Sequence, residues 1–502
     1  MVEPVFEKIS YQQKLPEVVG QVKIDCKSSL SSEDIANILV VSPFVCLDSN
    51  EFIDTKSKFN GKINFYITYI DKAGNIKKCE CGAEFGGDVD MGENYGERQK
   101  AKLSACAQKV EYDLSGIYLV VSAIVSVSIK ATQVVEKSAL IGGEDLYTNG
   151  CEFCSMQNLG KRTGAYPIEE EFDLAYPVEE VLYHKAEAVI TATQCGVGSI
   201  IVDGQVLLSL VLLQKNEKKD IMKESKILPF RMEIESEETM PNMMAVAWVR
   251  EKSFKTDVGV DEENGSSVVV AHVSLLFEGE AYNEVSKTVA KDVFSTSREI
   301  EIIKEDCEQV FPLESRSYSF LVGGRANIGE IPTSATAPIV CMENINILEA
   351  ESTANGLIVT ATYSGSIYFR DGDSVIARKF EMPFEKELSG TFDLDTLIEC
   401  EAKAFKGEAK IVSSTEVDID GEVYLTANLF KKCQTKMVSD IKLLKEKEEN
   451  SCAISVYLAI KDEEQFSLAK RLNVCPERLI ETNQDLQFPL TGNERIVVYR
   501  QK

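Results

Sequence analysis

The chain has little of what enzymes most often use. It contains two histidines, His184 and His272, in 502 residues, and a single tryptophan, Trp248. Histidine is the side chain whose ordinary pKa suits proton transfer near neutral pH. His272 lies in an alternating stretch on the side opposite its apolar members, and His184 follows Tyr183 at the start of a domain, so both predict structural or surface roles. Because a lone aromatic side chain makes no cage, we expect Trp248 in a core.

Phosphate-binding and membrane-spanning signals are also missing. The sequence has no GxGxxG motif and no Gly-Lys-Ser/Thr motif. Its longest apolar stretches, 117–129 and 206–213, are shorter than the roughly 20 residues that cross a bilayer. The first residues have neither the basic nor the apolar region of a secretory signal. We therefore expect a cytoplasmic protein that is not an enzyme, needs no cofactor and does not span a membrane.

Positive charge is in short supply. The 54 lysines and arginines are outnumbered by 81 aspartates and glutamates, which gives a formal net charge of −27. A charge of this sign repels the phosphates of nucleic acids and anionic membrane surfaces. The composition therefore excludes nucleic acid as an expected partner, and it favours a soluble surface or docking to a basic partner.

The 14 cysteines show no disulfide-scaffold spacing. Two close pairs, Cys79/Cys81 and Cys151/Cys154, would give zinc four thiolates only if distant parts of the chain met. We predict free thiols and no metal site, with reversible oxidation of Cys151 and Cys154 as an alternative if they are exposed. The glycine- and carboxylate-rich segment 82–93 lacks the order of calcium ligands of an EF-hand, so we interpret it as a hairpin loop.

What the chain does have is a repeated glycine motif. An apolar or aromatic residue, a polar residue, Gly, a polar residue and a β-former recur around Gly61, Gly204 and Gly365. A looser second motif follows each, at Gly116, Gly265 and Gly421. Each motif is expected to open a strand with one buried face, because apolar residues then alternate with polar ones. The predicted buried faces are Ile63 to Tyr69, Ile117 to Ile129, Val269 to Phe277 and Val423 to Leu429, each taken at every second residue.

These patterns predict a mainly β protein of three tandem antiparallel β-sandwich-like repeats and a small C-terminal βααβ module. A period near 150 residues is much longer than that of solenoids, so each repeat should bury its own core, like beads on a string. We place the repeats in 1–140, 150–300 and 301–440. The Lys/Glu-rich stretch 441–451 is predicted to be a charged helix or linker.

The C-terminal module, 452–502, has a course of its own. We expect a strand at 454–459, a helix around 466–472, a second helix from Pro476 and a strand at 495–499. This unit resembles a LysM domain. The resemblance lies in Leu468-Ala469-Lys470-Arg471, Pro476-Glu477-Arg478-Leu479, Asn483 and Gly492.

One departure from LysM domains is chemically important. The turn that helps to hold N-acetylated glycans in those domains is here Asp462-Glu463-Glu464-Gln465, which lacks glycine and carries carboxylates. This substitution hinders close backbone approach to a sugar amide. The surface implied by the resemblance, for a partner protein or a glycan, comprises Asp462, Glu463, Glu464, Gln465, Phe466, Asn483, Asp485, Leu486, Phe488 and Gly492.

The order of modules is similar to that of the SPOCS-domain family of spore-coat morphogenetic proteins, in which β repeats precede a terminal LysM domain. The resemblance implies a non-enzymatic protein on the mother-cell side of the forespore surface. It further implies a LysM module that engages the ATPase of the coat basement layer, and repeats that self-associate or recruit coat proteins. The alternative is a cell-wall protein that binds peptidoglycan or N-acetylglucosamine through the same LysM surface.

Overall fold

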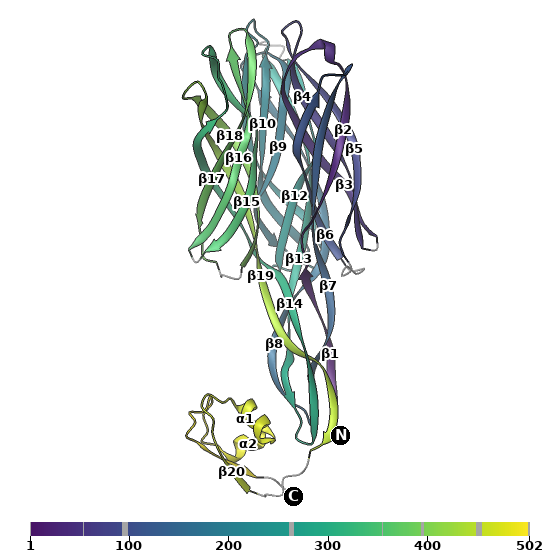
Figure 1. The fold of residues 1–502 in the computed structure, drawn as a ribbon, viewed down its shortest axis with the longest axis vertical. Coiled ribbons are helices and arrows are strands. Elements are labelled where there is room, and N and C mark those ends of the chain that lie inside the picture. Colours follow the sequence, from purple (N-terminus) through teal and green to yellow (C-terminus); the bar gives the residue numbers. More distant parts are fainter. Residues whose placement is uncertain are drawn as a thin grey trace.

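The computed structural model describes residues 2–53, 55–92, 99–260, 266–353, 355–392, 396–447 and 454–499. The predicted fold class is confirmed: the protein is nearly all β, its sheets are antiparallel, and a small helical part lies at the C-terminal end (Figure 1). Among the described residues, no helix has the length and apolar character needed to cross a membrane.

Each repeat begins and ends with a long strand, and the two pair along their length. In the second repeat β8 (Tyr147–Asp173) pairs with β13 (Ser267–Phe294), and in the third β14 (Arg298–Asn327) pairs with β19 (Glu416–Glu446). In the first repeat the opening strand is divided into β1 (Glu3–Lys14) and β2 (Val18–Ser31), which both pair with β7 (Tyr118–Glu144). The division falls at Pro16, which has no N–H to donate to a sheet.

Between its long strands each repeat has a three-stranded antiparallel sheet and one further strand that pairs with the closing strand. The three-stranded sheets are β3 (Ile35–Ile53), β4 (Lys56–Asp71) and β5 (Ile76–Asp90); β9 (Val178–Cys195), β10 (Ser199–Gln214) and β11 (Ile221–Glu235); and β15 (Ala335–Thr353), β16 (Gly356–Asp371) and β17 (Ser374–Ser389). The further strands are β6 (Gln99–Asp113), β12 (Met244–Val260) and β18 (Thr396–Ile411), and a short 3-10 helix, η1 (Ser32–Asp34), follows β2.

The interpretation of 82–93 as a hairpin loop is wrong over most of its length. Residues 82–90 belong to β5 and pair with β4 from Asn64 to Lys56. The glycines suit this position, because a Cβ at Gly86 would lie 2.6 Å from the side chain of Asn60 and one at Gly87 would lie 2.8 Å from the ring of Phe59. Residue 93 lies outside the described residues.

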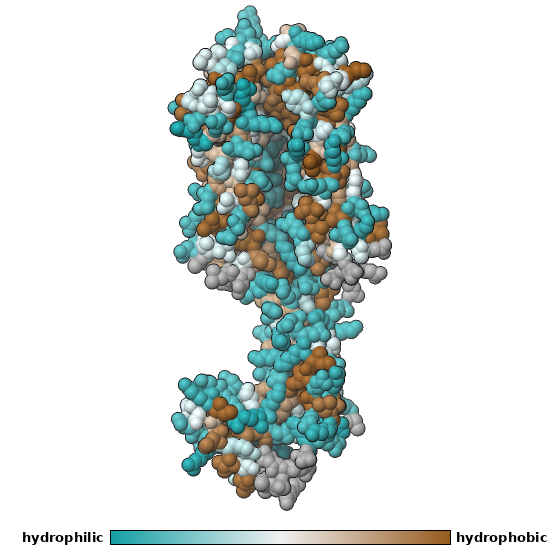
Figure 2. All heavy atoms as spheres, viewed as in Figure 1, coloured by the Kyte–Doolittle hydropathy of each residue, from teal (hydrophilic) through white to brown (hydrophobic). Residues whose placement is uncertain are grey.

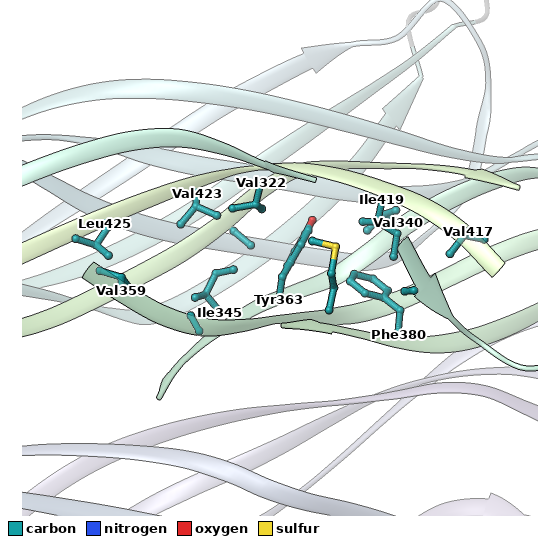
Figure 3. Packing of buried hydrophobic residues seen from close by; sticks show 14 of the residues in the cluster. Val322, Val340, Ile345, Val359, Tyr363, Phe380, Val417, Ile419, Val423 and Leu425 are labelled. Atoms are coloured by element: carbon teal, nitrogen blue, oxygen red, sulfur yellow. The ribbon is translucent and has the colours of Figure 1, made fainter. Parts of the chain in front are cut away.

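Every repeat buries a core between its two sheets, as the alternating patterns predict. The predicted faces of β4, β7, β13 and β19 are buried and form the centres of three separate clusters. Figure 3 shows the cluster of the third repeat, in which Tyr363 and Phe380 lie between Ile419, Val423 and their neighbours. The exception is Ile117, which is 75% exposed because it precedes β7 in the turn after β6.

The first glycine motif lies in the middle of a strand, and not at its beginning as expected. Gly61, Gly204 and Gly365 occupy the central strands β4, β10 and β16. A Cβ at Gly204 would lie 2.4 Å from the ring of Phe230 on the adjacent strand and 2.3 Å from a backbone oxygen. The rings of Phe85 and Phe380 crowd the other two glycines in the same way. The motif therefore marks the place where an aromatic ring crosses the central strand.

The second motif has no common structural position. Gly116 precedes β7, Gly421 lies inside β19, and Gly265 is outside the described residues.

The repeats are not beads on a string, because they pack side by side around a shared axis (Figure 1). At one end Val40 of β3, Leu182 and Tyr183 of β9, and Cys341 of β15 join in one cluster. At the other end the long strands continue past the sandwiches and form a stalk with its own core. That core contains Ala139 and Leu140 of β7, Val289 and Ala290 of β13, and Met437 and Val438 of β19.

The C-terminal module has the predicted βααβ course: β20 (Ile454–Leu458), α1 (Gln465–Leu472), α2 (Pro476–Thr482) and β21 (Arg495–Tyr499). Before it, β19 extends to Glu446, into the stretch expected to be a linker. The reason is pairing with β14, in which Ile441 lies opposite Ile302 and Glu446 opposite Arg298. Backbone hydrogen bonds and an ion pair between Arg298 and Glu446 therefore hold this charged segment in the sheet. Residues 448–451 lie outside the described residues.

Candidate functional site

The C-terminal module is built on the residues that carry its resemblance to a LysM domain. Leu468, Ala469 and Leu472 on α1 and Leu479 on α2 are buried against one face of the β20–β21 sheet. Helix α1 ends at Leu472 and is capped by Asn473, which adopts a left-handed conformation with φ 53°. Pro476 begins α2, where its missing N–H costs no hydrogen bond. The apolar spacing of the sequence therefore fixes which faces of the helices meet the sheet.

The module is mounted on the end of the stalk. The ring of Phe466 packs against Phe294 at the end of β13, with ring centroids 5.4 Å apart. The ammonium of Lys470 donates to both carboxylate oxygens of Asp292 at 2.8 and 2.7 Å. The side chain of Asn473 donates to the carbonyl of Thr296 and accepts from Lys447. These contacts give α1 one defined seat on the second repeat.

The predicted turn 462–465 is tied to its neighbours. The backbone N–H of Asp462 donates to the carbonyl of Leu490, and the N–H of Leu490 donates to the carbonyl of Glu463. The Glu463 carboxylate accepts two hydrogen bonds from Arg471, each 2.7 Å long. These bonds hold the pKa of Glu463 below its usual value. Only Asp462 and Glu464 of the turn are exposed to solvent.

The loop after α2, which carries the predicted surface residues Asp485 to Gly492, is also held by hydrogen bonds of its own. The carboxylate of Glu494 accepts hydrogen bonds from the backbone N–H groups of Thr491, Gly492 and Asn493, and its pKa is lowered to about 2, chiefly by the bonds from Thr491. Gly492 has φ 93°, a conformation that favours glycine. The loop is therefore a compact turn that closes over the start of β21.

The predicted surface residues thus divide into two groups. Asn483 acts inside the module, because its side chain bonds to Leu479 and to both backbone groups of Val497. Leu486 and Phe488 are half-buried against the core of the module, and Phe466 is half-buried beneath the stalk contact. Gln465 is half-buried at the start of α1. The side chains left for an outside partner are Asp462, Glu464 and Asp485.

An apolar surface that the sequence analysis missed lies on the outer face of the β20–β21 sheet. Ile454, Val456 and Leu458 are 59%, 61% and 70% exposed, and Tyr499, opposite Ile454, is 59% exposed. The strand was predicted, but its alternation points to the wrong face: Ile454, Val456 and Leu458 alternate with Ser455 and Tyr457, which favours burial of the more apolar set, yet that set is the exposed one. The buried face carries Tyr457, Ile496 and Val498.

A second feature that the sequence did not predict is a cavity of about 640 Å³ between the three repeats. Its walls come from β3, β6, β9, β12, β15 and β18, and Figure 2 shows a hollow in this face of the repeat body. Trp248 lines this cavity and is half-buried, so it does not lie in a core as expected. The ammonium of Lys102 lies 5.0 Å from the centre of its ring, a cation–π arrangement.

The cavity holds charged side chains that balance one another. Lys403 lies 3.2 Å from Glu401 and 3.8 Å from Glu187, and Lys185 pairs with Glu187 at 2.7 Å. Burial, with repulsion from Glu187, raises the pKa of Glu251 to about 8. Of these pairs, Lys403–Glu187 joins the third repeat to the second across the cavity, whereas the other two lie within one repeat.

The two histidines have no common site. His184 packs between Tyr66 and Phe254 at the cavity, and burial lowers its pKa to about 4. His272 is on the surface of β13, 3.2 Å from Asp257 and 3.4 Å from Glu169, in agreement with its predicted place. His184 Nδ1 lies 3.4 Å from the hydroxyl of Thr256, whereas the contacts that the structure records for His272 are with carboxylates.

The cysteine pairs belong to different regions. Cys151 packs at the edge of the stalk core, whereas Cys79 and Cys81 pack against the core of the first repeat. Cys154 is half-buried beside Ser286. The cysteines in the described part of the chain are free thiols, and no group of three or more potential metal ligands occurs there.

Comparisons of this chain with protein-family models, with curated proteins and with solved structures found no match.

Proposed function

We propose that this protein is a non-enzymatic assembly protein that docks onto a partner protein through its C-terminal module. The observation that carries the proposal is the mounting of that module. Phe466, Lys470 and Asn473 bind it to the end of the stalk, so one side faces the repeats and the other side faces outward. A module held in one orientation loses less freedom when it binds than one on a flexible tether.

The repeat body supports the same function. The three sandwiches share one cluster at the end away from the stalk, and a stalk core, which makes a stiff support about the common axis. A stiff support that displays a small binding module suits attachment to a surface with many identical sites, where repeated modest contacts add to high avidity. The order of modules favours the surface of a developing spore as the site of assembly, with the polymerising ATPase of the coat basement as the partner.

Glycan recognition is the less favoured alternative. Sugar amides are recognised by free backbone donors and acceptors in a pocket. In this module the N–H groups of Asp462, Leu490, Thr491 and Gly492 are all used in bonds between or within the loops. Acidic side chains at Asp462 and Glu464 occupy the place of the turn glycine.

The test is fluorescence imaging of the tagged protein in its native host through growth and sporulation, beside a form truncated before residue 452. The proposal expects a shell around the forespore that disperses on truncation. Uniform labelling of the vegetative envelope, or a shell that persists without the module, would overturn the proposal. A full-length Glu237→Lys form is the matched control, because Glu237 is exposed and lies in the repeat body, away from the C-terminal module.

A further inference from the structure

We propose that the C-terminal module binds its partner through the outer face of the β20–β21 sheet, which takes an apolar protein segment flanked by carboxylates. This inference rests on the proposed function and assigns its contact surface. The face is formed by Ile454, Val456 and Leu458 of β20, by Val497 and Tyr499 of β21, and by Ile460 just after β20.

The face is a continuous apolar surface, not scattered side chains. The pairing register places Tyr499 opposite Ile454 and Val497 opposite Val456, so two strands contribute neighbouring side chains on one side. Ile460 adds to it and is 54% exposed. In Figure 2 brown side chains gather on this part of the molecule. Contiguous exposed apolar area of this kind is typical of protein contact sites.

The other sides of the module are already engaged. The side formed by α1 is seated on Phe294 and Asp292 of the stalk. The two loops that carry Asp462 and Gly492 bond to each other through their backbones. Of the sides formed by described residues, the sheet face is the one that no other described element covers, and it lies opposite the helices that face the stalk (Figure 1).

Charge decides which occupant fits the face. Within 454–461 and 495–499 the charged residues are Lys461 and Arg495, and both are exposed, in a chain of net charge −27. The nearest acidic residue to β21 in the sequence, Glu494, turns its carboxylate to backbone N–H groups. Arg495 lies opposite Leu458 and so places a positive charge on this face, whereas Lys461, after Ile460, is followed by the exposed Asp462. A partner that complements the face offers apolar side chains beside carboxylates.

A second copy of this chain fits less well. A symmetric dimer brings the same face of each copy together, so the Lys461 and Arg495 side chains of both copies would lie in one interface. Like charges in such an interface oppose association. The complementary segment is thus assigned to a different protein, the partner of the proposed function.

The experiment is site-specific photo-crosslinking in the native host with the full chain. Benzoylphenylalanine replaces Val456 in one form and Asp485, on the loop side, in another. We expect adducts from position 456 whose mapped peptide in another protein has apolar residues flanked by Asp or Glu, and about tenfold fewer adducts from position 485. Adducts of twice the mass of this chain, adducts with peptidoglycan fragments, or equal yields from both positions would each overturn the inference.

Charge variants test the role of Arg495 independently. Arg495→Glu should reduce crosslinking from position 456 about tenfold, whereas Arg495→Lys should retain it. Equal yields in the two variants would contradict the assigned partner chemistry. Circular dichroism and thermal unfolding of each purified chain show whether it is folded.

Imaging separates failure of this inference from failure of the proposed function. Val456→Asp should disperse the forespore shell as the truncation does, while Val197→Asp, at a site 78% exposed in the repeat body, should leave it intact. If truncation disperses the shell and Val456→Asp does not, docking by the module stands and its assignment to this sheet face fails. If truncation leaves the shell intact, the proposed function fails.

Discussion

The ring of Phe466 meets the ring of Phe294 edge-on, with centroids 5.4 Å apart and ring planes at 68° to each other. Phe466 is the second residue of the first helix of the C-terminal module, and Phe294 ends the closing strand of the second repeat. Phe294 is only 3% exposed, because its ring packs against Tyr147 of β8 as well as against Phe466 of the module. This apolar contact is the centre of the interface between the module and the stalk, and the polar contacts of Lys470 and Asn473 surround it.

Phe294→Ala should release the module from the stalk without unfolding it. Loss of a buried phenylalanine ring costs about 3 kcal/mol, and the module keeps its own core around Leu479. Small-angle scattering of the full chain should show a larger maximum dimension. Leu479→Ala is the contrasting variant, because it removes a side chain from the core of the module and should make residues 454–499 sensitive to protease. Unchanged scattering by Phe294→Ala would show that the polar contacts alone hold this interface.

The ion pair between Glu463 and Arg471 gives the module a pH-dependent stability. The pKa of Glu463 is lower in the folded module than the ordinary value of 4.5, because Arg471 bonds to its charged form. The stabilisation is therefore complete above pH 4.5 and is lost as the pH falls through the folded value. Glu463→Gln should destabilise the module by about 1 kcal/mol near neutral pH.

The measurement is proteolysis of the full chain near Arg471, which reports opening of the module. The difference between Glu463→Gln and the unaltered chain should shrink as the pH falls below 4.5. Glu464→Gln is the matched control, since Glu464 is exposed and makes no such pair. Equal sensitivity of the two variants at pH 7 would contradict a role for the ion pair.

The local fold could be read from the sequence because its causes are local. Alternation identified the buried faces of β4 and β13, and proline and apolar spacing located α1 and α2. The arrangement of the repeats could not be read in this way. The stalk joins Ala139, Val289 and Met437, which are far apart in the sequence, and each of them also fits an ordinary alternating strand. Distance in sequence therefore hid the contacts that make three domains one body.

The candidate surface was predicted only in part, for a related reason. The LysM resemblance located the module, but it assigned Phe466 and Asn483 to a binding surface. The structure uses Phe466 for the stalk and Asn483 for β21. Neither use is visible from spacing, because one depends on a distant strand and the other on a side chain that bonds to backbone. The exposed face of β20 was missed because Ile454, Val456 and Leu458 alternate with Ser455 and Tyr457, a pattern that favours burial of the face that the structure leaves exposed.

The crowded glycines predict a graded response to added methyl groups. Gly204→Ala should destabilise the second repeat by about 3 kcal/mol, because the new Cβ meets a backbone oxygen at 2.3 Å and the Phe230 ring at 2.4 Å. Gly365→Ala should cost less, since its contacts are 2.8 and 3.0 Å. Gly142→Ala, with nothing within 4 Å, is the control. Thermal unfolding should rank the variants in this order, and an equal loss at Gly142 would refute the steric cause.

Because Glu251 lies in the central cavity, we expect the free energy of unfolding to fall as the pH rises. Its pKa in the folded chain is about 8, raised by burial and by Glu187 from an ordinary value of 4.5. Between these two values the folded state holds a proton that the unfolded chain has released. The folded state therefore loses stability relative to the unfolded state across this range, and the loss is complete once the pH exceeds the folded value.

Glu251→Gln should remove this dependence, because glutamine keeps the shape of the protonated side chain and never acquires its charge. The variant should match the unaltered chain near pH 4.5 and become more stable than it, by up to a few kcal/mol, as the pH approaches 8. Glu237→Gln, at an exposed position, is the control. Denaturant unfolding at a series of pH values measures the difference. If the two curves stay parallel from pH 5 to 9, the carboxyl of Glu251 is ionised in the folded cavity, and Lys403 and Lys185 together outweigh its burial.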